Sequence, residues 1–205
     1  MRIALEIKGI PYEYRAVHLI KDGGEQHTDA YRGLNPSREL PTLEIDGKVL
    51  AQSLSIIEYL EETRPGGFAP DGLLPGDAAK RAAVRRVSDM IASNIQPVQN
   101  LRVLQRIMGM FDDPANKQKH KISWGAHWID AGFEALEAVL EKTAGVYCIG
   151  DSLTMADCCL VPQVYNARRF KLDMSKFPVI SRIEAALVKL APFERAKPGA
   201  MPDAQ

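Results

Sequence analysis

The pattern of apolar and polar positions divides the chain into a mixed amino-terminal region and a longer helical region. Apolar side chains in residues 2–8 recur at helical spacing and stop at Gly9, which predicts the end of a helix. Residues 12–19 alternate and are rich in Tyr and Val, which predicts a strand. A short polar helix is predicted after two glycines, over residues 26–33.

A hairpin and a helix are predicted next. Residues 42–45 and 48–51 flank an Asp46-Gly47 pair, the usual composition of a two-residue hairpin turn. Residues 54–63 then show helical spacing, with Ser53 in place to cap the amino terminus. The side chains expected to face inward are Leu54, Ile57 and Leu60.

The rest of the chain is predicted to be helical beyond a linker. Residues 65–76 hold several prolines and glycines, which is typical of a connection between domains. The helical pattern is interrupted at Pro97, where we expect a kink. The predicted helices span residues 77–110, 120–142, 155–170 and 179–190, and the tail from residue 197 is expected to be mobile.

These elements predict an α+β first domain over residues 1–64, a linker over 65–76 and an all-helical domain over 77–205. The first domain is incomplete in this reading. One strand and one hairpin leave a sheet without a centre, and a two-stranded hairpin is marginal alone in water. We therefore expect a further segment, including a first strand, before residue 1.

Composition narrows the function classes. The 26 basic and 26 acidic residues balance, so the broad positive surface of a nucleic-acid binder is not expected. No apolar run reaches the ~18–20 residues of a membrane span, and no secretory signal is evident. The three cysteines indicate buried thiols in a reducing, cytoplasmic compartment. The four histidines lack metal-ligand spacing, so no metal site is predicted.

Leu40-Pro41-Thr42 is the first candidate for chemistry, because it precedes a predicted strand. A cis Leu40-Pro41 bond would turn the Leu40 backbone outward, unpaired, where an extended peptide can bind it as an added strand. An ordinary trans proline at the start of a strand explains the same residues.

Gln52-Ser53 is the second candidate, because it lies where the hairpin meets a helix. Free N–H groups and the helix dipole make that junction a suitable site for a carboxylate, and both side chains add donors. The alternative is that Ser53 only caps its helix.

Three further motifs have structural explanations as well. Gln96 and Asn100 lie on one helical face near the predicted kink, where they bind a ligand or satisfy freed backbone groups. Arg168-Arg169 ends a helix, where positive charge is favourable. The Thr154–Asp157 stretch is a capping box, and we interpret it as structural.

Several of these stretches together resemble the zeta class of glutathione transferases, whose founding activity is maleylacetoacetate isomerase. The resemblance runs almost from end to end of the chain. It is most specific in QSLxIIEYLEExRP, from Gln52, and in IQPxQN, from Ile95. The other matching stretches are Asn35-Pro36, Leu40 to Leu43, Gly150 to Asp157, Leu160 to Val164 and Asn166 to Phe170.

The resemblance implies a thioredoxin-like amino-terminal domain, an all-α glutathione-transferase-type domain, a homodimer and glutathione as cofactor. It implies a cis Pro41 and a Leu40 backbone that holds the cysteinyl part of glutathione. It implies that Gln52 and Ser53 bind the γ-glutamyl carboxylate and that Arg169 binds a carboxylate of a small acidic substrate. The remaining residues implied to contact glutathione are Gln26, Gln96 and Asn100.

The implied reaction is glutathione-dependent isomerisation of maleylacetoacetate to fumarylacetoacetate in tyrosine and phenylalanine breakdown, with side activity on small α-halo acids. Members of the class carry a Ser-Ser-Cys motif and a first strand upstream of the stretch matching residues 2–5. Neither is present here, so no catalytic residue is assigned and we expect the 205-residue chain itself to show little activity.

The other departures from the class are Arg102, where Ser is usual, and two insertions, near residues 66–72 and 111–121. The second insertion lengthens a connection above the implied site. The competing hypotheses are a non-catalytic dimerisation or docking module and a general detoxifying transferase of another class. Retention on immobilised glutathione favours an enzyme, and a substrate panel separates the two kinds of transferase.

Overall fold

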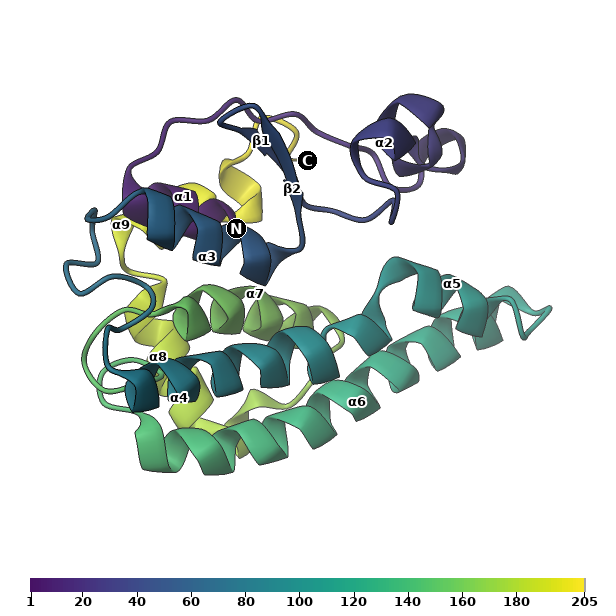
Figure 1. The fold of residues 1–205 in the computed structure, drawn as a ribbon. Helices are drawn as coiled ribbons and strands as arrows, with labels where there is room; N and C mark the ends of the chain where they lie inside the picture. The colour runs from purple at the N-terminus through teal and green to yellow at the C-terminus, as the bar shows by residue number, and fades with distance from the viewer. Residues whose placement is uncertain (205) are drawn as a thin grey trace. The chain divides into compact units, whose positions relative to one another are not determined.

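The computed structural model describes residues 1–204, and the chain forms two compact units (Figure 1). The first unit comprises Met1–Pro70 and the carboxy-terminal segment from Pro192, and the second comprises Asp71–Ala191. The carboxy-terminal segment therefore packs with the first unit, whereas the sequence places it in the helical domain. The guanidinium of Arg2 donates to the carbonyl of Ala196 at 3.1 Å, which fastens this segment to the first helix.

The first unit combines short helices with one hairpin. The predicted helix before Gly9 and the predicted hairpin are both confirmed. Gly9, with a φ of 65°, ends that helix. The antiparallel strands pair Thr42 with Ala51 and Ile45 with Lys48. The elements are α1 (Arg2–Lys8), α2 (Asp29–Leu34), β1 (Thr42–Ile45), β2 (Lys48–Ala51), α3 (Ser53–Thr63) and most of α9 (Ala191–Ala196), with 3-10 turns at Lys21–Gly23, Glu25–His27 and Pro198–Ala200.

The strand predicted over residues 12–19 is wrong. The segment runs without regular structure, and its side chains are exposed or half-buried. Alternation alone does not make a strand, because a strand needs a neighbour for its backbone hydrogen bonds. Among the described residues the sheet contains only β1 and β2, which pair with each other. The alternating pattern of residues 12–19 carries no information on whether another strand lies beside them.

The start of α3 also differs from the prediction. The helix begins at Ser53, and the residue that flanks it is Gln52, so Ser53 lies in the first turn instead of capping it. No side chain caps this end. The buried side chains of α3 are Ile56, Ile57 and Leu60, and Leu54 is half-buried. The helix is therefore rotated slightly from the predicted inward stripe.

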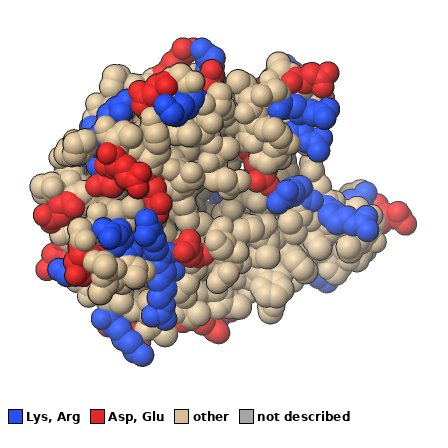
Figure 2. Space-filling view, in the orientation of Figure 1, with Lys and Arg blue, Asp and Glu red and all other residues tan. Residues whose placement is uncertain are grey.

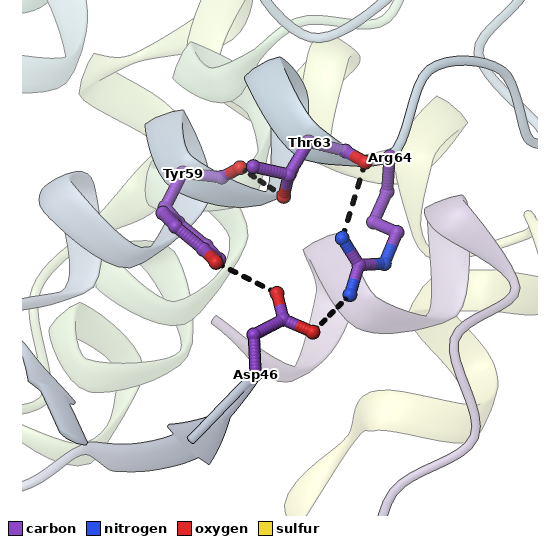
Figure 3. Close-up of polar contacts among 4 residues, drawn as sticks. All are labelled: Asp46, Tyr59, Thr63 and Arg64. Carbon is purple, nitrogen blue, oxygen red and sulfur yellow. Dashed lines mark hydrogen bonds and ion pairs between the residues drawn. The ribbon is translucent and has the colours of Figure 1, made fainter. Parts of the chain in front are cut away.

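A polar network joins the hairpin turn to the end of α3 (Figure 3). One oxygen of the Asp46 carboxylate accepts a hydrogen bond from the Tyr59 hydroxyl at 2.7 Å. The other lies 2.6 Å from the guanidinium of Arg64. Arg64 also donates to the Thr63 carbonyl at 3.1 Å. Because Asp46 sits at the tip of the hairpin, the network fixes β1 and β2 against α3.

We expect this network to make stability depend on pH. The hydrogen bond from Tyr59, and then that from Arg64, lower the pKa of Asp46. The contribution is therefore present above the unfolded value of about 3.9 and is lost as the pH falls through the lower folded pKa. The measurement is urea unfolding of the parent and Asp46→Asn at pH 7 and pH 3. The gap between their midpoints should narrow at pH 3, and an equal gap at both pH values would contradict the role of the ionised carboxylate.

The second unit is helical, as predicted. The long pattern from residue 77 is broken near Pro97, where a π-turn (Met90–Ile95) and a 3-10 turn (Pro97–Gln99) separate two helices. The kink is thus confirmed and extends over two turns. The helices are α4 (Ala78–Asp89), α5 (Leu101–Met108), α6 (Pro114–Thr143), α7 (Met155–Arg169) and α8 (Pro178–Leu187), with a further 3-10 turn at Met174–Lys176.

Helix α6 organises this unit, and it runs alongside the π-turn, α5 and α8 (Figure 1). It also caps a neighbour. The buried carboxylate of Glu137 accepts hydrogen bonds from the backbone N–H groups of Val179 at 2.6 Å and Ile180 at 3.0 Å, in the first turn of α8. These N–H groups would otherwise lack partners, so Glu137 fixes where α8 begins.

Candidate functional site

The register of the hairpin places two candidate segments at the same end of it. Because Thr42 pairs with Ala51, the preceding Pro41 and the following Gln52 occupy the next positions along the two strands. Leu40-Pro41 and Gln52-Ser53 therefore lie together at the open end of the hairpin. The sequence singled out these two segments separately, and the pairing brings them together.

The backbone groups of Leu40 are left without hydrogen-bond partners in the described part of the chain. The peptide bond between Leu40 and Pro41 is cis, as the resemblance implied. The residues on either side are anchored: the Tyr31 hydroxyl donates to the Glu39 carbonyl at 2.8 Å and shares a hydrogen bond with Thr42 Oγ1 at 2.9 Å. Asn35 Nδ2 donates to the same carbonyl at 2.8 Å. Leu40 is 43% exposed, and its N–H and C=O form no hydrogen bond within the described part of the chain.

The amino terminus of α3 is open beside this backbone. Gln52 is exposed and has a φ of 71° and a ψ of 119°, a backbone conformation that residues other than glycine rarely adopt. Strained backbone of this kind persists where the surroundings fix it, often at binding sites. Since no side chain caps α3, its first N–H groups are open at the end that Gln52 flanks, and Ser53 lies in this first turn. The arrangement offers several donors and a positive helix dipole to an anion.

Gln26 is held close to a turn. The residue is 6% exposed, and its Nε2 donates to the Leu19 carbonyl at 3.3 Å. A β-carbon on Gly24 would clash with this side chain, so the glycine makes room for it. The other amide atom, Oε1, is buried without a hydrogen-bond partner among residues 1–204. Buried acceptors are seldom left unpaired, and this one is suited to a donor from a bound molecule.

In the second unit, Gln96 and Asn100 lie on either side of the 3-10 turn. Gln96 Nε2 donates to Asn100 Oδ1, so each amide uses one of its polar atoms on the other. Gln96 is exposed and Asn100 is half-buried. Asn100 also flanks the amino terminus of α5 without capping it. The remaining polar atoms of both amides form no hydrogen bond within the described residues.

The two arginines at the end of α7 have different surroundings. The Arg168 guanidinium lies 2.8 Å from the Glu184 carboxylate. Arg169 is exposed and forms no ion pair or hydrogen bond with any described residue. Of the two arginines, only Arg169 has a guanidinium without a protein partner among the described residues. Both carry the favourable charge of a helix end, but Arg169 alone is open to an acidic ligand.

The three cysteine thiols are not suited to act as nucleophiles. Burial raises the pKa of all three thiols: Cys148 and Cys158 well above the ordinary range, and Cys159 to about 11. Such thiols are protonated at neutral pH and are poor nucleophiles.

Within residues 1–204 no group of His, Cys, Asp or Glu side chains is arranged to hold a metal ion. No helix in this part of the chain is long and apolar enough to cross a membrane.

Comparison with known proteins identifies the family. The glutathione S-transferase amino-terminal domain model matches residues 1–63, and the glutathione S-transferase carboxy-terminal domain model matches residues 126–183. The maleylacetoacetate isomerase of Mus musculus is 50% identical over 203 residues, which cover 99% of this chain and 88% of that protein. The chain belongs to the maleylacetoacetate isomerase branch of the glutathione S-transferase family.

Other relatives of this family agree with the assignment. A maleylpyruvate isomerase of Ralstonia sp is 44% identical over 99% of this chain and 92% of that protein. The solved holo structure of a maleylpyruvate isomerase, described as a zeta-class bacterial glutathione S-transferase, superposes with a TM-score of 0.90 at 43% identity, covering 100% of this chain and 93% of that chain. A maleylacetoacetate isomerase of Methylobacterium extorquens, solved with bound malonate and glutathione, also gives 0.90, at 33% identity and 100% and 92% coverage.

The glutathione S-transferase fold explains the two units: a small thioredoxin-like unit, here with a two-stranded sheet, and a helical unit. The face shown in Figure 2 mixes basic and acidic side chains, in keeping with the balanced composition. Sequence reasoning missed Glu137 and the Asp46 network, because their partners are distant in the chain. It also left out Gln99 and Asn166, although both lie inside quoted motifs.

Proposed function

We propose that this chain binds glutathione and a small dicarboxylate and serves the glutathione-dependent cis-trans isomerisation of maleylacetoacetate or a close analogue. The observation that carries the proposal is the open end of the hairpin. There the unpaired backbone of Leu40, an exposed residue, lies beside the uncapped amino terminus of α3. A γ-glutamyl peptide has both groups that such an end can bind: an extended backbone and a terminal carboxylate.

The residues of the first unit fit glutathione. The Leu40 backbone pairs with its cysteinyl part, as a strand pairs with its neighbour. Gln52, Ser53 and the first N–H groups of α3 bind the γ-glutamyl carboxylate. The buried, unpaired Oε1 of Gln26 accepts a hydrogen bond from the tripeptide. When bound, glutathione supplies the sulfur nucleophile that isomerisation of a conjugated cis double bond requires.

The residues of the second unit fit the acidic partners. Arg169 binds a carboxylate of the substrate with its planar pair of donors and so orients the double bond. The free amide atoms of Gln96 and Asn100 add hydrogen bonds to glutathione. We assign no residue of this chain to activation of the thiol. The proposal extends to a cytoplasmic homodimer in tyrosine and phenylalanine breakdown with side activity on α-halo acids. The names of the similar proteins support the isomerase activity within this proposal.

The proposed function is tested by comparing binding with turnover. The 205-residue chain is titrated with glutathione and malonate, and conversion of maleylpyruvate is followed with and without glutathione. The same assay is run on the chain extended at its amino terminus by a Ser-Ser-Cys-bearing segment. We expect binding by both proteins and glutathione-dependent turnover by the extended one. Binding without turnover by the extended protein indicates a docking module, and no binding by either rejects the proposal.

Gln52 gives a prediction in which stability and binding move apart. Gln52→Gly removes the strained side chain, so the free energy of unfolding should be unchanged or higher by about 1 kcal/mol. The same change removes an amide donor, so glutathione should bind about three- to tenfold more weakly. Unfolding in urea and calorimetric titration measure the two effects.

The matched control is Gln105→Gly, at an exposed position inside α5. Glycine at this position should lower the free energy of unfolding by about 1 kcal/mol and leave the affinity for glutathione unchanged. Unchanged glutathione affinity in Gln52→Gly would remove Gln52 from the binding site.

A further inference from the structure

Three side chains fasten the turn that carries Gln96 and Asn100. Gln99, which is 5% exposed, donates from Nε2 to the Ile95 carbonyl at 2.9 Å. Its Oε1 accepts a hydrogen bond from Asn166 Nδ2 on α7. The indole nitrogen of Trp124, on α6, donates to the Val98 carbonyl at 2.7 Å. The turn is therefore held by the end of the preceding π-turn, by α6 and by α7.

Helix α6 also brings the end of α7 close. A β-carbon on Gly125 would clash with the ring of Phe170, the residue that follows α7. A β-carbon on Gly132 would clash with the Ile95 side chain. These two glycines therefore let Phe170, after α7, and Ile95, the last residue of the π-turn, pack directly on α6. Trp124, which contacts Val98, directly precedes Gly125, which contacts Phe170. Together with the Gln99–Asn166 hydrogen bond, these contacts form a closed ring through the turn, α6 and the end of α7.

Asn166 links this ring to the proposed substrate site. Asn166 and Arg169 are three residues apart on α7, so their side chains are neighbours on one face of the helix. Gln99 lies in the turn between Gln96 and Asn100. A single side-chain hydrogen bond thus joins the turn that bears the two amides to the helix end that bears the arginine.

We propose that Gln99 and Asn166 are a positioning pair, which holds Arg169 in the orientation that binds a substrate carboxylate. This inference rests on the proposed function. Neither residue touches the substrate in this arrangement; both act on it through Arg169. Loss of Asn166 leaves a buried acceptor on Gln99 without its donor, so the turn and the end of α7 shift apart to admit water.

The first test is malonate affinity, measured by calorimetric titration at saturating glutathione. We expect Asn166→Ala to weaken malonate binding about five- to tenfold, and Gln99→Met, a replacement of similar volume, to do the same. The matched control is Tyr165→Ala, one residue away and 49% exposed, which should change affinity less than twofold. In an Arg169→Met background, Asn166→Ala should have no further effect, because the pair acts through Arg169.

The second test follows the turn itself without any ligand. The chain has two tryptophans, so Trp128→Phe leaves Trp124 as the single emitter. Trp124 reports on the turn because its indole bonds to Val98. Asn166→Ala in this background should shift the emission to longer wavelength and raise quenching by acrylamide, while Tyr165→Ala should do neither.

The outcomes separate the two proposals. Malonate binding by the parent that is unaffected by Asn166→Ala and Gln99→Met would overturn the positioning pair and leave the proposed function standing. Additive losses in the Arg169→Met background would also overturn the pair, because the effect would not pass through Arg169. Failure of the parent to bind malonate would reject the proposed function and the positioning pair with it.

Discussion

Arg169→Met is expected to weaken malonate binding by about 10- to 100-fold at saturating glutathione, because a hydrogen-bonded charge pair contributes about 1.5–3 kcal/mol. The structure leaves the Arg169 guanidinium exposed and without a protein partner among the described residues, so its loss should not unfold α7. Calorimetric titration measures the effect directly. Glutathione affinity measured without malonate should change little, since Arg169 is assigned to the substrate alone.

The adjacent Arg168 supplies a matched control. Arg168→Met removes the same charge from the same helix end, but Arg168 is paired with Glu184. Its loss should cost at most about 1 kcal/mol of stability and leave malonate affinity within about threefold. Equal losses of affinity in the two variants would mean that net charge at the helix end, and not a specific contact, attracts the acid.

Asp157→Ala is expected to lower the free energy of unfolding by about 3–5 kcal/mol, a large part of the stability of a typical domain. The carboxylate is fully buried and accepts three hydrogen bonds: from Cys148 N at 2.9 Å, Thr154 N at 2.8 Å and Thr154 Oγ1 at 3.0 Å. Burial raises the pKa of Asp157, and these donors oppose the rise. Removal of the carboxylate leaves two buried N–H groups unpaired. Urea unfolding followed by circular dichroism measures the loss.

Asp151→Ala tests whether burial of the carboxylate explains the large loss of stability expected for Asp157→Ala. Asp151 also accepts a backbone hydrogen bond, from Val146 N at 2.8 Å, but it is exposed. Water replaces the lost partner there, so the cost should be about 1 kcal/mol or less. A loss for Asp157→Ala as small as that for Asp151→Ala would contradict the structural role assigned to the Thr154–Asp157 box.

Elements set by local sequence could be predicted, and elements set by distant partners could not. The Asp46-Gly47 hairpin and the break near Pro97 follow from turn chemistry and from the missing proline N–H, and both are present. Residues 12–19 failed as a strand, because alternation does not say whether a neighbouring strand exists. The start of α8 depends on Glu137, more than 40 residues earlier, and no local pattern shows that contact.

The candidate site was predictable as a set of segments but not as an arrangement. The sequence named Leu40-Pro41 and Gln52-Ser53 one at a time, each with an ordinary structural explanation. The register of the hairpin then placed both at one end, where an open helix terminus favours an anion over a simple Ser53 cap. Likewise, Arg168 and Arg169 were alike in the sequence, and only the Glu184 contact distinguishes them.

The most direct test of the hairpin-end site is a calorimetric titration of the chain with three peptides: glutathione, γ-glutamylcysteine and cysteinylglycine. If the start of α3 binds the γ-glutamyl carboxylate and the Leu40 backbone binds the cysteinyl part, γ-glutamylcysteine should bind within about tenfold of glutathione. Cysteinylglycine, which lacks that carboxylate, should bind at least about 100-fold more weakly. Equal affinity for cysteinylglycine and glutathione, or no binding of any of the three peptides, would contradict this site.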